Sequence, residues 1–388
     1  MTLKTECPQR VARLQEKLRA QGLDGALFIY PIDIYYFTAT RQNSTLWIPA
    51  QGEPLLLVRK SLARAKEEAC IADIRPFPRS KGFAPLFTGV QKIGTTFDVM
   101  SVQLFQYYGR LLPGIEFVDL SGLNRELRAV KSNFELERLR YAGSQLCQVF
   151  AAVPEFLRPG MREVDLAAEF EARLRKLGGE GYVRMRAYNQ ELFMGLVVAG
   201  TSGSSTGFFD GAVTGRGMSG ASPHGASGAV IEPNQPILID YTGVFDGYII
   251  DVTRMFVCGK LNEKLQHAFE VACRIQAAVV ERLKPGAICS ELFALALKMA
   301  DEAGLGAYFM GAPGENARFI GHGVGLELDE MPVLAQGFDQ PLVAGQTIAI
   351  EPKFVFPALG PIGIENTFAV TPSGGEKLSP LADDLVRV

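Results

Sequence analysis

Short apolar runs alternate with amphipathic stretches along the first third of the chain. Apolar residues recur at helical spacing over 11–21, which predicts a helix that ends at Gly22. Helix-like segments at 61–69 and 99–112 separate apolar runs of strand length. These runs are 26–30, 46–49, 54–58 and 92–97. The alternation predicts an α/β unit of roughly 125 residues.

A second domain begins where the pattern changes to long helices. Ser132 and Glu135 fit a Ser-x-x-Glu capping box, which opens a helix that Pro159 and the glycine after it end. We therefore predict domains at 1–126 and 127–388. A shift of 126 residues superimposes this Pro-Gly pair on the one at 285–286, and similar helical patterns surround both. Such a repeat predicts two similar halves that enclose one site.

The clearest strand signal lies at 236–257, where two apolar runs flank an Asp246-Gly247 turn. Asp240 and Asp251 lie on opposite arms and come close to a directly opposed pair. Cross-strand neighbours have Cβ atoms ~5 Å apart, which suits two ligands of one metal ion or of two close ions. The alternative is that both aspartates are exposed polar positions of a half-buried hairpin.

Two glutamates repeat this arrangement nearer the C-terminus. Glu351 and Glu365 each follow an isoleucine in an otherwise apolar segment, on two expected strands around a turn at 357–361. A carboxylate in apolar surroundings is costly to bury unless a cation compensates it. Two such residues facing each other favour a metal site.

The chain has three histidines, so a His-rich zinc site is excluded. His322 lies between glycines that allow close backbone approach, and it supplies a nitrogen ligand beside the four carboxylates. Such an oxygen-rich set favours Mn²⁺, Fe²⁺ or Co²⁺, with Zn²⁺ as a further option. Two ions ~3.5–4 Å apart can share a hydroxide, which is hydrolytic chemistry. His267, in a helical run, is interpreted as a surface or packing residue.

Composition excludes several other functions. The net charge is −3 without clustered Lys or Arg, so we expect neither a nucleic-acid partner nor a membrane surface. No apolar run approaches the ~20 residues that span a bilayer, and the N-terminus lacks a signal-peptide core, so we expect a cytoplasmic protein. Six cysteines without CxxC spacing predict reduced, mostly buried thiols. The glycine-rich segment 199–220 matches no phosphate loop and is interpreted as an active-site loop or insertion.

The ligand order Asp, Asp, His, Glu, Glu resembles that of the pita-bread metallopeptidases, which include prolidase, aminopeptidase P, methionine aminopeptidase and creatinase. The matching motifs are IDYTG at Asp240, IDVTR at Asp251, GHGVG at His322, IEP at Glu351 and IEN at Glu365. The resemblance implies two divalent ions bridged by Asp251 and Glu365. It further implies that Asp240 completes one ion, that His322 and Glu351 complete the other, and that His224 in SPHGAS lies in the substrate pocket.

The same resemblance implies the fold and the activity. We expect an N-terminal creatinase/prolidase-type α/β domain followed by a pita-bread α+β domain with an internal pseudo-twofold repeat. The implied enzyme is a homodimeric peptidase that cleaves before proline in Xaa-Pro dipeptides or longer peptides. A metal-bridging hydroxide would attack the carbonyl while Glu351 shuttles its proton and His224 steadies the substrate. Methionine aminopeptidases lack the first domain, so they are ranked lower as a match. Creatinase and non-catalytic relatives have lost the metal or its ligands, and the presence of all five ligands here argues against both.

Two positions depart from the family pattern. Asp329 stands seven residues after His322, where family peptidases carry a substrate-contacting histidine, and Gly363 stands where many prolidase-like members carry an arginine. An aspartate would repel a developing oxyanion but could recognise a cationic group. The alternative function is therefore a non-peptidase metallohydrolase or lyase that acts on a small cationic substrate.

Overall fold

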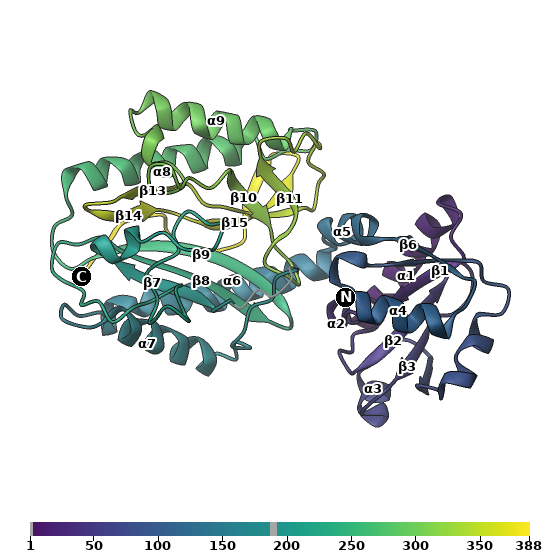
Figure 1. The fold of residues 1–388 in the computed structure, drawn as a ribbon. Helices are drawn as coiled ribbons and strands as arrows, with labels where there is room; N and C mark the ends of the chain where they lie inside the picture. Colours follow the sequence, from purple (N-terminus) through teal and green to yellow (C-terminus); the bar gives the residue numbers. More distant parts are fainter. Residues whose placement is uncertain (1–2, 187–191) are drawn as a thin grey trace. The chain divides into compact units, whose positions relative to one another are not determined.

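The computed structural model describes residues 3–186 and 192–388, which form two compact units. Unit 1 comprises the described residues up to Arg128 together with Arg186. Unit 2 comprises Ala129–Met185 and the described residues from 192 to Val388. Each unit has its own sheets and is described separately (Figure 1).

Unit 1 is built on a six-stranded sheet in the order β4-β3-β2-β1-β5-β6. Its strands are β1 Gly25–Phe28, β2 Ser44–Pro49, β3 Leu55–Val58, β4 Asp73–Pro76, β5 Lys92–Thr95 and β6 Glu116–Asp119. Its helices are α1 Leu3–Ala20, α2 Pro31–Thr38, α3 Leu62–Glu68, α4 Val102–Leu111 and α5 Ser121–Ala129, with 3₁₀ turns at Ser80–Gly82, Ala84–Phe87 and Phe97–Val99. The expected α/β unit is confirmed. Helices α2 and α5 and strands β4 and β6 went unpredicted because each is short, and no residue of β4 or β6 is buried.

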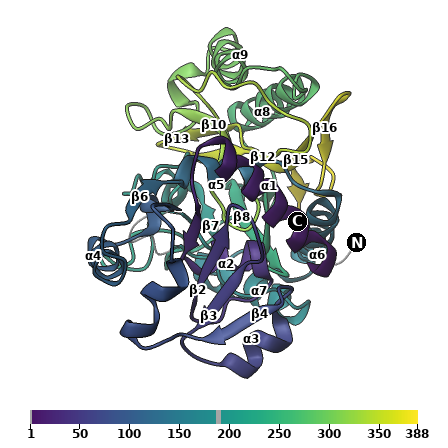
Figure 2. The same ribbon diagram turned by 90° about the vertical axis from the view of Figure 1, so that its right-hand side faces the viewer.

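Two helix pairs in unit 2 confirm the predicted internal repeat. The helices are α6 Asn133–Phe156, α7 Glu163–Lys176, α8 Glu263–Glu281 and α9 Cys289–Glu302. Helices α7 and α9 are both 14 residues long and begin 126 positions apart. The Ser132–Glu135 capping box opens α6 as predicted. Helices α8 and α9 lie on one side of the strands and α6 and α7 on the other (Figures 1 and 2).

Three sets of strands lie between these helix pairs. One sheet has the order β17-β9-β8-β7, a second has the order β11-β10-β12-β15-β16, and β13 pairs with β14 alone. The bounds are β7 Gly195–Ala199, β8 Ile237–Phe245, β9 Tyr248–Val257, β10 Phe319–Gly323, β11 Glu330–Ala335, β12 Thr347–Ile350, β13 Lys353–Phe356, β14 Gly360–Gly363, β15 Asn366–Thr371, β16 Gly374–Lys377 and β17 Val386–Arg387. Short 3₁₀ turns lie at Gly200–Ser204 and Gly306–Tyr308. Strands β8 and β9 form the predicted hairpin, and Asp246 and Gly247 both have positive φ, as its two-residue turn requires.

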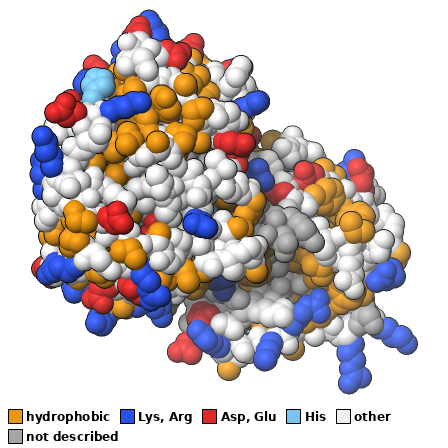
Figure 3. Space-filling model, turned by 60° about the vertical axis from the view of Figure 1, so that its left-hand side comes forward, with side chains coloured by type: hydrophobic (Ala, Val, Ile, Leu, Met, Phe, Trp, Pro, Cys, Tyr) orange, Lys and Arg blue, Asp and Glu red, His pale blue; other side chains and the backbone are white. Residues whose placement is uncertain are grey.

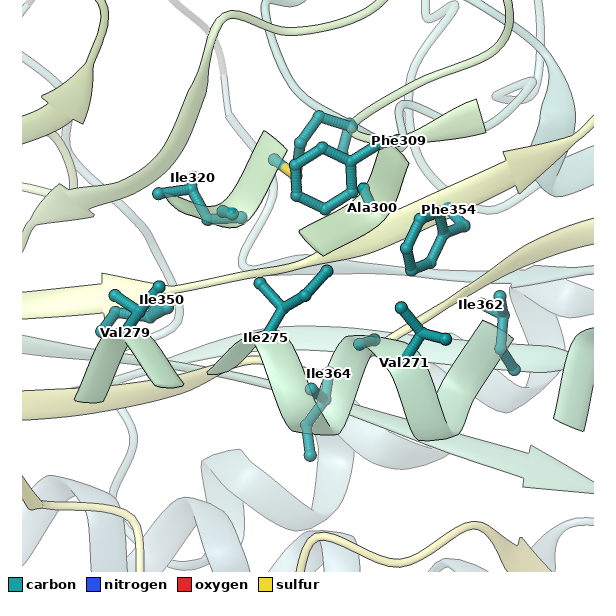
Figure 4. Packing of buried hydrophobic residues seen from close by; sticks show 14 of the residues in the cluster. Val271, Ile275, Val279, Ala300, Phe309, Ile320, Ile350, Phe354, Ile362 and Ile364 are labelled. Carbon is teal, nitrogen blue, oxygen red and sulfur yellow. The ribbon is translucent and has the colours of Figure 1, made fainter. Parts of the chain in front are cut away.

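The core under α8 supports the strands that carry the second pair of carboxylates. Val271, Ile275 and Val279 on α8 face Ile350 and Phe354 (Figure 4). All five side chains are fully buried. The end of β12 and the start of β13 are therefore held by close packing, which fixes the residues between them.

The distribution of charged side chains and the state of the cysteines can be compared with what the composition predicts. On the face in Figure 3, basic and acidic side chains are interspersed and do not gather by sign. Within the described residues, no helix combines the length and the apolar character that crossing a membrane requires. The cysteines are free thiols, as predicted, and most of them are buried.

Candidate metal site

The β8–β9 hairpin places Asp240 and Asp251 on one face of its sheet. Asp240 pairs with Thr253, and Asp251 pairs with Thr242, so the two aspartates are diagonal neighbours across the strands. Both carboxylates point toward the strands of the second sheet, since Asp240 shares a lysine partner with Glu365 and Asp251 Oδ2 lies 3.9 Å from His322 Nε2. The hairpin thus supplies two carboxylates to one cluster, and the Asp251 side chain is 8% exposed.

Glu351 and Glu365 lie at breaks between strands, which corrects the expectation that they lie within strands. Glu351 follows β12 directly, and Glu365 directly precedes β15. The register is the same on both sides of the break, since Ile350 pairs with Asn366 and Lys353 pairs with Gly363. The two glutamates therefore face each other at the base of the β13–β14 hairpin.

The break has a structural cause in the neighbouring sheet. The backbone of Glu365 pairs with Thr253 on β9, with N–O distances of 3.2 and 3.4 Å. The hydroxyl of Thr253 also donates to Glu365 Oε2 at 2.9 Å. Glu365 thereby joins the two sheets and is held next to both aspartates.

His322 reaches the same cluster from β10, where it pairs with Ala349 on β12. Its Nδ1 is 3.0 Å from the carbonyl oxygen of Leu328. Because a carbonyl only accepts, Nδ1 is the donor, and the lone pair of a neutral ring lies on Nε2. Nε2 is 3.6 Å from Glu351 Oε1 and 3.9 Å from the nearest oxygens of Asp251 and Glu365. Three carboxylate oxygens thus converge on this nitrogen without being within hydrogen-bond distance of it.

These donors fit one divalent cation. Asp251 Oδ1 and Glu365 Oε1 are buried and have no hydrogen-bond partner among the described residues. Burial, followed by the charges of Glu365 and Asp240, raises the pKa of Asp251 well above its usual value. Ligand atoms of Asp251, His322 and Glu365 all lie within 4.8 Å of one another. A divalent ion would compensate the buried charge and satisfy the unpartnered oxygens, and the donor set suits Mn²⁺, Fe²⁺, Co²⁺ or Zn²⁺.

Lys353 is a member of the cluster that the sequence analysis missed. Its Nζ lies 2.7 Å from Asp240 Oδ2 and 2.8 Å from Oε2 of both Glu351 and Glu365, and its side chain is 3% exposed. Burial alone lowers the pKa of this ammonium, but the three carboxylates outweigh burial and raise it well above its usual value. The signal was present in the sequence, because a lysine two residues after Glu351 in an apolar strand shares its face and needs a buried partner.

The two departures from the family pattern both border this cluster. Asp329 Oδ1 is 3.4 Å from His322 Nδ1, and the Asp329 side chain is 45% exposed. Burial lowers the pKa of His322, but Asp329, Glu351 and Glu365 outweigh burial and raise it. Gly363 lies opposite Lys353, and a Cβ at Gly363 would be 2.6 Å from Lys353 Cγ.

His224 is enclosed by aromatic rings. The ring of Phe193 is parallel to the imidazole at 6.1 Å, and Phe209 and Phe208 lie at 5.4 and 6.4 Å. Burial lowers the pKa of His224 although Asp240 raises it, so the ring is neutral at pH 7. Its Nδ1 is buried without a partner among the described residues.

The phenylalanines around His224 show what the glycine-rich segment contributes. Phe208 and Phe209 belong to the 199–220 segment and also line a cavity of about 310 Å³. This segment therefore forms one wall beside His224. The third histidine, His267, is exposed on α8, in agreement with its interpretation as a surface residue.

Comparison with known proteins supports both domain types. Residues 137–372 match the model of metallopeptidase family M24, and residues 10–130 match the creatinase/prolidase N-terminal domain. The chain is 26% identical to a Xaa-Pro dipeptidase of Pyrococcus furiosus, over 97% of this chain and 99% of that protein. It is 28% identical to a probable dipeptidase PepE of Mycobacterium tuberculosis, over 95% and 92%. A Xaa-Pro dipeptidase structure from Bacillus anthracis has a TM-score of 0.84 at 25% identity and covers 98% of this chain and 100% of its own. The architecture expected from the sequence resemblance is confirmed.

Proposed function

Because this chain belongs to metallopeptidase family M24, we propose that it is a metal-dependent peptidase that cleaves the bond before proline in Xaa-Pro dipeptides. One observation carries the proposal: the carboxylates of Asp251, Glu351 and Glu365 converge on His322 in a buried cluster that contains unpartnered oxygens. Relatives named as Xaa-Pro dipeptidases match nearly the full length of the chain, which supports the substrate class.

The residues of unit 2 supply the ligands and a base. Asp251, His322, Glu351 and Glu365 would hold a divalent ion, with Asp240 at the edge of the cluster. Such an ion polarises a carbonyl and lowers the pKa of water when bound. We assign the transferred proton to Glu351 because the resemblance of its IEP motif to the family pattern implies that role.

The surroundings of His224 suit the ring of a proline substrate. A neutral imidazole offers one N–H donor and one acceptor, and its Nδ1 has no partner that it would have to leave. Phe193, Phe208 and Phe209 provide apolar faces beside it, two of which are exposed to an incoming ligand. We infer that His224 donates to or accepts from the substrate while the phenylalanines contact the pyrrolidine ring.

Hydrolysis of dipeptides by the Mn²⁺- or Co²⁺-loaded full-length protein tests the proposal. Xaa-Pro dipeptides with small and large first residues are compared with Xaa-Ala dipeptides, Pro-Xaa dipeptides and Xaa-Pro-Yaa tripeptides. The expected result is release of free proline from Xaa-Pro dipeptides and little cleavage of the Xaa-Ala and Pro-Xaa sets. No cleavage of any Xaa-Pro substrate by protein with measured bound metal would contradict the proposal. Cleavage of the tripeptides would extend it to an aminopeptidase.

Asp329 favours one second candidate, a metallohydrolase or lyase for a small cationic compound. Its half-exposed carboxylate beside His322 could pair with a substrate cation. The substitution Asp329→His separates the candidates. If the variant gains peptidase activity that the parent lacks, the second candidate gains support. If it only impairs existing peptidase activity, the second candidate is wrong.

A further inference from the structure

The ammonium of Lys353 occupies the centre of one half of the cluster. Asp240, Glu351 and Glu365 surround Nζ at 2.7, 2.8 and 2.8 Å, and they come from three different parts of the fold. An ammonium has three N–H donors and no lone pair. Each donor of Lys353 has one carboxylate acceptor, so this side chain acts as a cation and cannot be a metal ligand.

Glu351 and Glu365 each direct one carboxylate oxygen toward the Lys353 ammonium and the other toward His322. Their Oε2 atoms accept from Lys353, and their Oε1 atoms lie 3.6 and 3.9 Å from His322 Nε2. Ligand atoms bound to one ion at ~2.0–2.2 Å are about 3.0–4.2 Å apart. The distances from His322 Nε2 to Glu351, Glu365 and Asp251 all fall in this range, so the position beside His322 suits an ion. The position beside Asp240 already holds a nitrogen cation and does not fit a second ion.

We infer that the Lys353 ammonium replaces one of the two divalent ions expected for this scaffold, so that the site binds a single ion between Asp251, His322, Glu351 and Glu365. The inference rests on the proposed metallopeptidase function, since it concerns the same site. Charge supports it: one divalent ion and one ammonium offset three of the four carboxylate charges. A second ion would have to displace the ammonium from its acceptors and leave it buried and unpaired, which is costly.

Gly363 is the neighbour that makes room for this lysine. It lies directly opposite Lys353 in the β13–β14 hairpin. A Cβ at this position would be 2.6 Å from Lys353 Cγ and 2.7 Å from Lys353 Cα. A larger residue at 363 is therefore incompatible with the observed path of the Lys353 side chain. The glycine and the lysine form one structural unit.

Metal stoichiometry of the full-length protein tests the inference. The protein is stripped with chelator, loaded with excess Mn²⁺, desalted and analysed for metal per chain, with electron paramagnetic resonance as a second readout. The wild type is expected to hold one ion with the spectrum of an isolated Mn²⁺. Lys353→Ala removes the cation and its volume, so metal per chain is expected to double and the spectrum to show two coupled spins.

A matched control is Lys377→Ala, which removes a lysine paired with Asp383 elsewhere in unit 2 and should leave the count at one. Two coupled ions in the wild type would overturn the inference, and so would a Lys353→Ala variant that folds and still binds one. If that variant fails to fold, the number of metal ions bound per wild-type chain still tests the inference. Peptidase assays on the same samples separate the two proposals. Two bound ions in an active enzyme would contradict only the single-ion inference. One bound ion without Xaa-Pro hydrolysis would contradict only the proposed function.

Discussion

Gly363→Ala tests the packing that places Lys353 in the cluster. The three atoms nearest the new Cβ would all lie within 3.0 Å of it, namely Lys353 Cγ at 2.6 Å and Lys353 Cα and the Pro352 carbonyl oxygen at 2.7 Å. Gly363 does not have a positive φ, so the backbone itself tolerates alanine and the cost is steric. Overpacking of this kind costs about 1–3 kcal/mol. For a unit of this size that corresponds to a fall in Tm of roughly 2–12 °C.

Differential scanning calorimetry of the metal-free protein measures this cost. Gly228→Ala is the control, because a Cβ there meets no atom within 4 Å, and it should change stability by no more than ~0.5 kcal/mol. In a Lys353→Ala background the contact with Cγ is gone, so the cost of Gly363→Ala should fall by about 0.5 kcal/mol or more. An equal cost in both backgrounds, or none in the wild type, would show that the lysine does not pack against Gly363.

Three further predictions follow from the site, the core and the thiols. Glu351→Gln removes the proposed base and a metal ligand, so kcat for Xaa-Pro hydrolysis should fall at least 10²-fold in steady-state assays. Ile275→Ala empties a fully buried position under β12 and β13 and should lower the free energy of unfolding by about 2–5 kcal/mol in thermal or denaturant melts. Burial raises the pKa of Cys147 and Cys289 to about 11, so roughly one thiol in a thousand is a thiolate at pH 8. Iodoacetamide should label both slowly at pH 8, and faster as the pH rises toward 11.

Each of these predictions has a control and a contrary result. Glu376→Gln, in an exposed ion pair, should leave kcat within twofold, and a similar kcat for Glu351→Gln would remove that residue from catalysis. Leu297→Ala, at a half-exposed position on α9, should cost ~0.5 kcal/mol or less, and an equally small loss for Ile275→Ala would contradict its role in the core. Labelling of Cys147 and Cys289 at pH 8 as fast in the native protein as in urea would show that they are not shielded.

The sequence predicts those parts of the site whose signals are local. Asp240 and Asp251 flank an Asp-Gly turn within alternating strands, so their hairpin and approximate register follow from the residues alone. Glu351 and Glu365 could be paired from their apolar contexts. Their position at strand breaks could not be predicted, because the break arises from the pairing of Glu365 with Thr253, which lies more than a hundred residues earlier in the chain.

Other features depend on contacts that no local pattern encodes. The carboxylates around Lys353 come from β8, from the end of β12 and from the residue before β15, and only the tertiary fold brings them together. The aromatic wall beside His224 comes partly from a glycine-rich segment without periodicity. Asp329 was noticed as a departure in the sequence, but its approach to the far side of the His322 ring depends on the turn between β10 and β11.

Activity measured against added metal tests the central claim most directly. Metal-free protein at a concentration far above the Kd is titrated with Mn²⁺, and proline release from a Xaa-Pro dipeptide is measured at each ratio. Activity should rise linearly and stop rising at about one equivalent per chain, because Lys353 already fills the second cation position. A rise that continues to two equivalents, or no proline release at any ratio, would contradict the account.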